Sequence, residues 1–223
     1  MITQIIYTIL FLVGFYAIIQ VCELLYHKFN VSVEITRKTA HILGSISSLS
    51  FLVFFKSHWY VLVIASTFFL ILWISKQKGM FRSIDLIERR SMGSYILPIS
   101  IYLNFLIFEF YDDNLYFILP VLILAISDPL AGLVGTRYKE AKRIKIQSVK
   151  FQKTYVGSFA FFIATYVLTV STFYFYNISS QNILILGFYF AIALTFMELI
   201  SNRGFDNLSV PLLTAVLIWI VRS

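Results

Sequence analysis

The residue of this sequence that most needs a chemical explanation is Asp128, a carboxylate close to the end of a long apolar run. A charged side chain inside a bilayer costs about 2.5–3.5 kcal/mol, so it needs a partner or a function. Proteins usually hold Mg²⁺ with one or two carboxylates together with substrate phosphates. We therefore predict that Asp128 holds a metal ion on a nucleotide phosphate, with Gly135 allowing close approach and Arg137 following. The alternative is a helix kinked at Pro129, whose aspartate pairs with a nearby basic residue and whose glycines pack against another helix.

A second group of polar residues opens the next apolar run, where Lys153-Thr154 is followed, after two residues, by Gly157-Ser158. Backbone N–H groups at a helix N-terminus, helped by the lysine and the hydroxyls, form an anion site suited to a phosphate. The alternative is a basic anchor at the membrane surface, followed by the small-residue face of a packed helix.

Two more carboxylates, Glu198 and Asp206, stand on either side of a short connector, and Asn207 follows directly. They could complete a metal site or position an attacking hydroxyl. A capped turn between two helices would also use Gly204 and the Asp206-Asn207 pair, so both interpretations stay open.

The fourth element is Arg37-Lys38 followed by His41. These residues are separated by one helical turn, so we predict that they share a helix face that binds phosphate or assists proton removal. The alternative is a structural histidine near the membrane surface, and the same alternative applies to His27 and His58.

The composition shows that the elements positioning these residues are membrane helices. Of the 223 residues, 59% are hydrophobic and 13% are charged, whereas soluble domains carry about 25% charged residues. The apolar runs are continuous rather than alternating, which excludes barrel strands. We predict an all-α, polytopic transmembrane protein with about seven or eight spans, forming a single domain over residues 1–223. The net charge of +7 lies in the connectors, which favours membrane orientation over nucleic-acid binding.

We place eight spans in the apolar runs of the chain. Their bounds are Ile2–Cys22, Ala40–Phe55, Trp59–Ile74, Gly93–Phe110, Leu115–Val134, Tyr155–Phe175, Ile183–Ile200 and Leu208–Val221. All of the 18 Lys and Arg residues except Lys56 and Arg222 then fall on one face. The positive-inside rule makes that face cytosolic and places both termini on the opposite side. The first run lacks a basic region before it and an obvious cleavage site, so we interpret it as a retained span.

The connector between the third and fourth spans predicts an amphipathic helix at the membrane surface. Its apolar residues recur at helical spacing among charged ones: Met80, Phe81, Ile84 and Ile87 stand among Lys78, Arg82, Asp85, Glu88, Arg89 and Arg90. This pattern is typical of a helix that lies against anionic headgroups. A solvated connector is the alternative.

Nearly all polar residues that would be costly within a span fall at the cytosolic ends of the spans. They include Glu23, Arg37, Lys38, His41, Asp128, Lys153, Glu198, Asp206 and Asn207. A transporter more often places such residues near the bilayer midplane, at interrupted helices. A one-sided cluster instead indicates a reaction at the cytosolic surface between a water-soluble substrate and a lipid. A small multi-pass transporter remains the alternative from another functional class.

The four elements, in this order, resemble those of the membrane-bound CTP-dependent lipid-alcohol kinases, which include dolichol kinase and phytol kinase. There is a wider resemblance to phosphatidate cytidylyltransferase. The motifs cover about residues 34–212, and the stretch from Glu198 through Asp206-Asn207-Leu208 to Val210-Pro211 is the most specific. Val156 is a departure, since the family usually has glutamate there.

The resemblance implies transfer of the γ-phosphoryl group of CTP, or of another nucleoside triphosphate, to the hydroxyl of a long-chain isoprenoid alcohol such as dolichol, polyprenol or phytol. It implies Mg²⁺ as the cofactor. The catalytic roles fall to Asp128, Lys153, Glu198 and Asp206, and the metal-binding role falls to Asp128, Glu198 and Asp206. The nucleotide contacts fall to Arg37, Lys38, His41, Gly135, Arg137, Thr154, Gly157, Ser158 and Asn207. The alternative within this chemistry is cytidylyl transfer to a lipid phosphate. The small size and the absence of a transit peptide favour a prokaryotic cell membrane.

Overall fold

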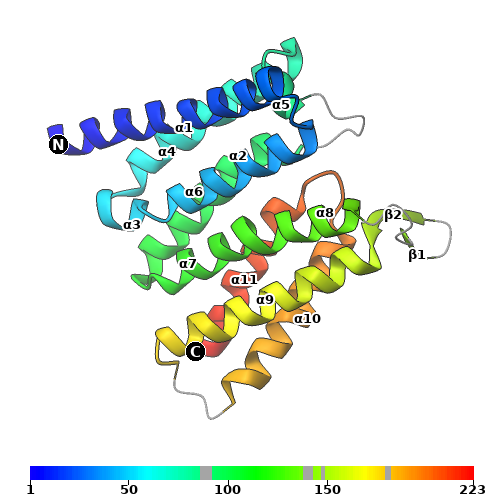
Figure 1. Ribbon diagram of the computed structural model, residues 1–223. Helices are drawn as coiled ribbons and strands as arrows, with labels where there is room; N and C mark the ends of the chain where they lie inside the picture. The colour runs from blue at the N-terminus through cyan, green and yellow to red at the C-terminus, as the bar shows by residue number, and fades with distance from the viewer. Residues whose placement is uncertain (86–91, 138–142, 147–148, 179–181) are drawn as a thin grey trace.

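The continuous apolar runs fold into helices that lie side by side, with one β-hairpin at an end of the bundle (Figure 1). The computed structural model describes residues 1–85, 92–137, 143–146, 149–178 and 182–223. The elements are α1 (Ile2–Phe29), α2 (Val33–Ser48), α3 (Phe51–Phe54), α4 (His58–Lys78), α5 (Arg82–Asp85), α6 (Gly93–Tyr111), α7 (Leu115–Leu122), the π-helix η1 (Ile123–Ser127), α8 (Asp128–Arg137), β1 (Arg143–Ile146), β2 (Val149–Thr154), α9 (Tyr155–Phe175), α10 (Ile183–Ile200) and α11 (Asp206–Arg222).

Each of the eight predicted spans corresponds to one helix or to consecutive helices. Helices α2 and α3 share the second span, and α7, η1 and α8 together form the fifth. Six segments are long and apolar enough to cross a membrane: Ile2–Phe29, His58–Lys78, Gly93–Tyr111, Leu115–Arg137, Tyr155–Phe175 and Ile183–Ile200. Helices α2 and α11 are shorter, with 16 and 17 residues. The prediction of an all-α, polytopic membrane protein is confirmed, with the antiparallel β1–β2 hairpin as the small exception in the described part of the chain.

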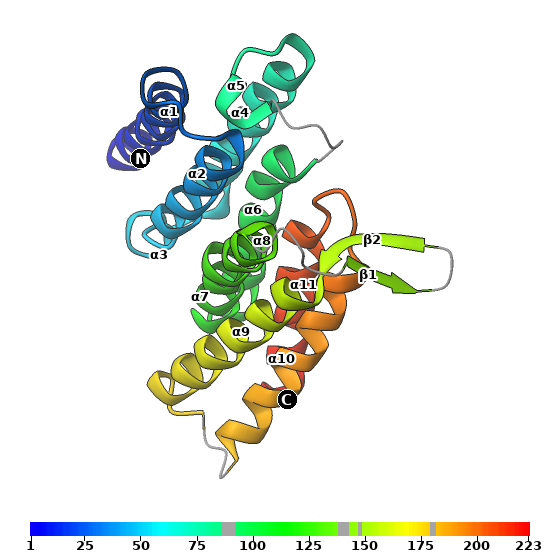
Figure 2. The same cartoon turned by 45° about the vertical axis from the view of Figure 1, so that its right-hand side comes forward.

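Helix α7 lies between two hydrophobic cores and contributes to both. Phe117 and Val121 pack into a core with side chains of α1, α3, α4, α5 and α6. Leu115 and Leu119, on another side of α7, pack into a core with side chains of α8, α9, α10 and α11. The continuation of α7 through η1 into α8 therefore runs along the boundary of the two halves (Figures 1 and 2), and Asp128 is the first residue of α8.

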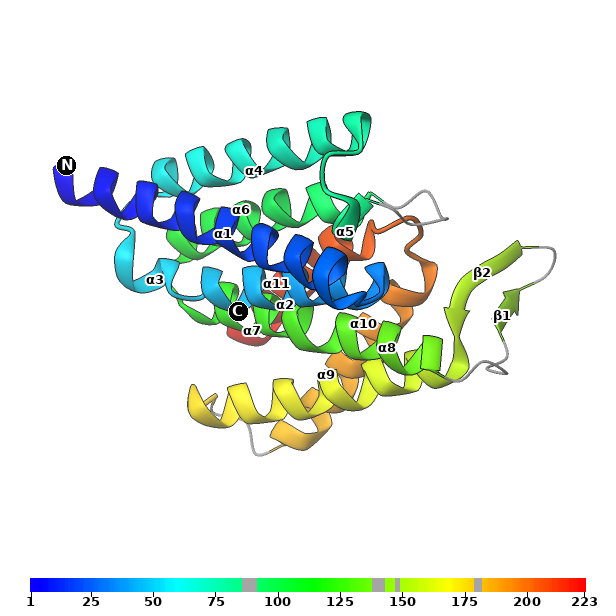
Figure 3. The same ribbon diagram turned by 45° about the horizontal axis from the view of Figure 1, so that its top comes forward.

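The connectors collect at the two ends of the bundle as the charge pattern predicted. At one end the Met92 N–H donates to the Arg203 carbonyl at 2.7 Å, and the β1–β2 hairpin projects from the same end (Figure 3). At the other end Arg222, beside the C-terminus, pairs with Asp113 at 2.9 Å. The N-terminal segment also lies there, since the Gln4 amide donates to the Phe54 carbonyl. The basic connectors among the described residues and the terminal segments thus lie at opposite ends of the bundle.

Two apolar residues of the segment predicted to form an amphipathic surface helix are buried in the bundle instead. Its described helix, α5, comprises only Arg82–Asp85, and Phe81 and Ile84 are buried in the first core. The Ser83 N–H donates to Glu23 of α1, which fixes this turn against the bundle. These apolar residues therefore pack against protein rather than headgroups. The rest of the predicted helix, from Ile87 to Arg90, lies outside the described residues.

Candidate active site

Asp128 lies next to a local change in helix type, which the following proline explains. In the π-helical turn η1, the Asp128 N–H donates to the carbonyl of Ile123, five residues back. At this spacing the Leu124 carbonyl would need an N–H from Pro129, which has none. The imidazole of His41 replaces it, with Nε2 at 2.9 Å from the Leu124 oxygen. Such π-helical turns are frequent at functional sites, and this one joins α2 to the segment that carries Asp128.

Helix α2 presents its polar residues on two overlapping faces. The Lys38 ammonium is buried and lies 3.3 Å from the Pro129 carbonyl. Gly132 leaves room for it, because a Cβ at that position would overlap the lysine side chain. Arg37 and His41 instead line a cavity enclosed by other helices. Lys38 is therefore directed to α8 and Arg37 to the cavity, while His41 reaches both sides, and the role of this face in binding phosphate or removing a proton stays a prediction.

A second set of charged residues meets around Lys153, the residue before the N-cap of α9. Its ammonium lies 2.5 Å from Oε1 of Glu198 and 2.6 Å from Oδ2 of Asp206. Burial alone would lower the pKa of Lys153, but the carboxylates of Asp206 and Glu198 outweigh burial and raise the pKa above its ordinary value of 10.5. Lys153 therefore stays a cation at physiological pH. Segments far apart in the sequence, β2, α10 and α11, are joined by this ion-pair cluster.

Glycines allow α8 and α9 to touch beside that cluster. An added Cβ would lie 2.7 Å from the Thr154 hydroxyl if placed at Gly135, and 2.7 Å from a backbone carbonyl of α8 if placed at Gly157. Thr154 is the N-cap of α9, and its hydroxyl accepts a hydrogen bond from the Gly157 N–H at 3.1 Å. The Ser158 hydroxyl lies 3.5 Å from Glu198. In this state these residues, predicted to hold phosphate, make hydrogen bonds or packing contacts within the protein.

Asn207 and Arg137 differ in their surroundings, although both were predicted to contact the nucleotide. The buried Asn207 amide donates to the Gly93 carbonyl at 2.9 Å, which fixes the start of α11 to the start of α6. Arg137 is exposed at the end of α8. Asn207 thus holds the site together, whereas Arg137 is open to a ligand.

The Asp128 carboxylate is close to both charged groups. It interacts electrostatically with Lys38 and His41 of α2 and with Lys153 and Glu198 of the ion-pair cluster. Within the described ranges it forms no hydrogen bond or ion pair. Asp128 is therefore the carboxylate that a cation can reach without breaking an existing ion pair.

The donor set suits a metal ion bridged to a nucleotide better than a metal held by protein alone. Across the part of the chain that the structure describes, no group of three or more His, Cys, Asp or Glu side chains is placed to hold a metal. Mg²⁺, however, is usually held by one or two carboxylates together with substrate phosphates. Asp128 fits that requirement, and the assignment of Asp128, Glu198 and Asp206 as metal ligands stays a prediction.

Sequence reasoning missed the role of Glu34 and of one backbone carbonyl. Glu34 lies 3.6 Å from both Arg37 and Lys38. Its spacing of three and four residues from these cations is typical of helical ion pairs and could have revealed it. The Leu124 carbonyl carries no such signal, because its availability depends on the π-helical turn.

The fold and the site together define an integral membrane protein of helices, with carboxylates and cations of α2, α8, β2, α10 and α11 gathered at one end. A known enzyme is similar to this chain. The chain is 29% identical over 208 residues to phytol kinase from Synechocystis sp., covering 91% of this chain and 86% of that protein. No family model matches the sequence, and no solved structure matches it. The similarity supports a family like the phytol and dolichol kinases, so the resemblance predicted from the motifs is confirmed.

Proposed function

We propose that this protein is a membrane-embedded kinase that transfers the γ-phosphoryl group of CTP, or of another nucleoside triphosphate, to the hydroxyl of a long-chain isoprenoid alcohol of the phytol, dolichol or polyprenol type. The observation that carries the proposal is that the Asp128 carboxylate interacts with two lysines, Lys38 and Lys153, in a chain similar to phytol kinase. Phosphoryl transfer depends mainly on positioning and on neutralising charge. The lysines can position and neutralise the phosphates, and the unpaired carboxylate of Asp128 can hold a metal ion.

The cations of the site hold the triphosphate in this proposal. Lys38 and Arg137 contact phosphate oxygens from α2 and α8. A phosphate that approaches Lys153 competes with Glu198 and Asp206 for the same ammonium, so nucleotide binding releases carboxylate oxygens. Asp128, with one of those carboxylates, would hold Mg²⁺, which would supply charge neutralisation on the phosphates.

His41 accepts the proton of the lipid hydroxyl. A carbonyl only accepts hydrogen bonds, so the contact with Leu124 places the ring proton on Nε2 and leaves Nδ1 as an acceptor in the neutral imidazole. The hydroxyl oxygen forms the new bond to the γ-phosphorus, the bond from that phosphorus to the β,γ-bridging oxygen breaks, and the nucleoside diphosphate leaves. The hydroxyl proton passes to Nδ1.

We place the site on the cytosolic face of a prokaryotic cell membrane. The end of the bundle that carries it is also the end to which the basic connectors belong, and such connectors are retained in the cytosol. A cytosolic site has direct access to nucleoside triphosphates.

The test is purified protein with γ-labelled CTP or ATP, Mg²⁺, and a panel of prenols and phosphatidate. Label in the lipid product supports the kinase. Label in pyrophosphate would instead show cytidylyl transfer, and substrate flux in vesicles without nucleotide turnover would show a transporter.

The matched variants for this assay are Asp128→Asn and Asp112→Asn. Asp128→Asn should abolish transfer and leave membrane insertion unchanged. Asp112 is exposed at the other end of the bundle in a left-handed conformation that asparagine tolerates, so Asp112→Asn should keep full activity. A fully active Asp128→Asn variant would exclude the metal role.

A further inference from the structure

We propose that the hydrocarbon chain of the lipid alcohol occupies an apolar cavity between α1, α2, α4 and α6, with its hydroxyl at the end formed by Arg37 and His41. The inference rests on the proposed function, because it locates the second substrate of that reaction.

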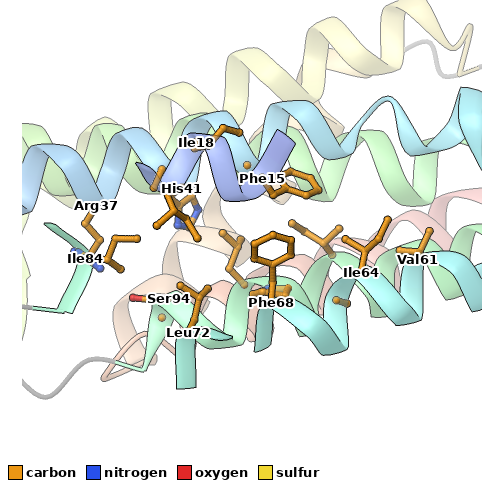
Figure 4. A pocket seen from close by; sticks show the side chains of 18 of the residues that line it. Phe15, Ile18, Arg37, His41, Val61, Ile64, Phe68, Leu72, Ile84 and Ser94 are labelled. Atoms are coloured by element: carbon orange, nitrogen blue, oxygen red, sulfur yellow. The ribbon is translucent and has the colours of Figure 1, made fainter. Parts of the chain in front are cut away.

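The cavity is apolar along its length and polar at one end. Its volume is about 100 Å³, and the walls are mainly aliphatic and aromatic side chains, among them Phe15 of α1 and Ile64 and Phe68 of α4. Figure 4 shows Arg37 and His41 toward one end of the cavity and Ile64 toward the other. This polarity matches a molecule with one hydroxyl and a long hydrocarbon chain. Apart from Arg37 at the polar end, the described lining residues offer no charged partner to a nucleoside triphosphate.

The polar end of the cavity adjoins the charged site on two sides. His41 lines the cavity and also contacts the Leu124 carbonyl, beside Asp128. Gly93 lines the cavity too, and its carbonyl holds Asn207, the neighbour of Asp206. A hydroxyl at this end is therefore close to both groups of charged residues.

Arg37 provides a further polar contact at this end. Its Nε is buried and has no hydrogen-bond partner among the described residues, while one of its terminal nitrogens lies 3.6 Å from Glu34. A buried donor without a partner carries a desolvation cost. The hydroxyl of a bound alcohol would supply the missing acceptor.

The size of the cavity indicates how much of the chain it holds. Pockets for drug-sized ligands usually have about 300–1,000 Å³, so this cavity takes the part of the chain nearest the hydroxyl. The remainder extends into the surrounding lipid. Selection among alcohols then depends on the carbons nearest the hydroxyl, whose branches contact the side chains that line the cavity.

Gly44 allows the cavity to be filled without disturbing the fold. It lines the cavity, and a Cβ added there meets no atom within 4 Å. Gly14 of α1 is the matched control, because it is equally open but exposed and is not among the residues lining the cavity. The series is Gly44→Ala, Gly44→Leu and Gly44→Phe, compared with Gly14→Phe.

We expect kcat/KM for phytol to fall in that order, by about tenfold or more for the largest side chain. A short, water-soluble prenol occupies the same part of the cavity, so its kcat/KM should fall in the same order, whereas the nucleotide KM should stay unchanged. Gly14→Phe should behave as wild type with both alcohols. The graded series keeps the test valid if the phenylalanine variant does not fold.

A binding measurement separates this inference from the proposed function. A long-chain alcohol carrying a diazirine, irradiated with the nucleotide-free wild-type protein, should label peptides of α1 and α4 and should do so less in Gly44→Phe. Labelling confined to other helices, or a Gly44→Phe variant as active on phytol as an active wild type, would overturn the cavity assignment. A wild type that phosphorylates no alcohol would overturn the proposed function, and the labelling would then decide the cavity alone.

Discussion

Replacing Lys153 by methionine tests whether the ion-pair cluster depends on that ammonium. Methionine keeps much of the apolar stem but leaves Glu198 and Asp206, whose side chains are 3% and 12% exposed, without their partner. Removing one member of a buried ion pair costs about 3–5 kcal/mol. Because the Lys153 side chain is itself 20% exposed, we expect a loss near the lower limit, about 3 kcal/mol.

The assay is denaturant unfolding of the detergent-solubilised protein, followed by circular dichroism. Arg222→Met is the control, because the Arg222–Asp113 pair at the other end is 40% and 22% exposed and such pairs contribute about 0–1 kcal/mol. The raised pKa of Lys153 means that its contribution is complete below pH 10.5 and is lost only as the pH rises through the higher folded value. Wild-type stability should therefore show no step from Lys153 between about pH 6 and about pH 9.

The triple variant Lys153→Met, Glu198→Gln and Asp206→Asn separates unpaired charge from lost packing. Neutralising both carboxylates removes the uncompensated charge, so this protein should regain most of the stability that Lys153→Met loses, and it should remain inactive. A Lys153→Met protein as stable as wild type, or a triple variant no more stable than the single one, would refute this account of the cluster.

Three further predictions follow from single contacts. Gly157→Ala puts a methyl group 2.7 Å from a carbonyl of α8 and should lower the free energy of unfolding by about 1–3 kcal/mol. Gly14→Ala has open space around it and should raise the free energy of unfolding by about 0.5–1 kcal/mol. Equal free energies for the two variants in denaturant unfolding would contradict the close contact. Asn207→Ala leaves the Gly93 carbonyl without its donor and should cost about 1–3 kcal/mol, measured as a lower Tm with unchanged nucleotide affinity. Chelating divalent cations should stop phosphoryl transfer, and Mg²⁺ should restore it; activity that persists in chelator would exclude the metal.

The helices could be predicted because span and side depend on composition averaged over many residues. Their ends could not. Helix α2 begins at Val33, before the expected start at Ala40, since Glu34 pairs with Arg37 and Lys38 at helical spacing and so extends the helix through a charged stretch. Charged residues at the edge of an apolar run therefore mark where the apolar run stops, but the helix itself can continue through them.

The sequence predicted that the charged residues of the site gather at one end of the bundle, but not which of them contact one another. Lys153 and Glu198 both fall at the predicted cytosolic ends of their spans, which places them at the same end of the bundle. The sequence does not show which lysine pairs with which carboxylate. Lys153 was expected to hold phosphate, whereas in the ligand-free chain it neutralises two carboxylates, since buried charges need partners. The cavity was not predicted either, because its walls have the same apolar character as lipid-facing side chains.

In the proposed reaction, two substrates of opposite polarity meet at one reacting oxygen, and α2 is the element that would separate them. Consecutive helical residues point about 100° apart, so Lys38 reaches α8, the side proposed for the nucleotide, while Arg37 reaches the apolar cavity. His41 lies between these directions and contacts both. The Leu124 carbonyl that fixes its ring proton is available because Pro129 has no N–H. In the proposed reaction, the proline that follows Asp128 would orient a base toward the lipid hydroxyl, while the aspartate itself would remain for the metal ion on the nucleotide.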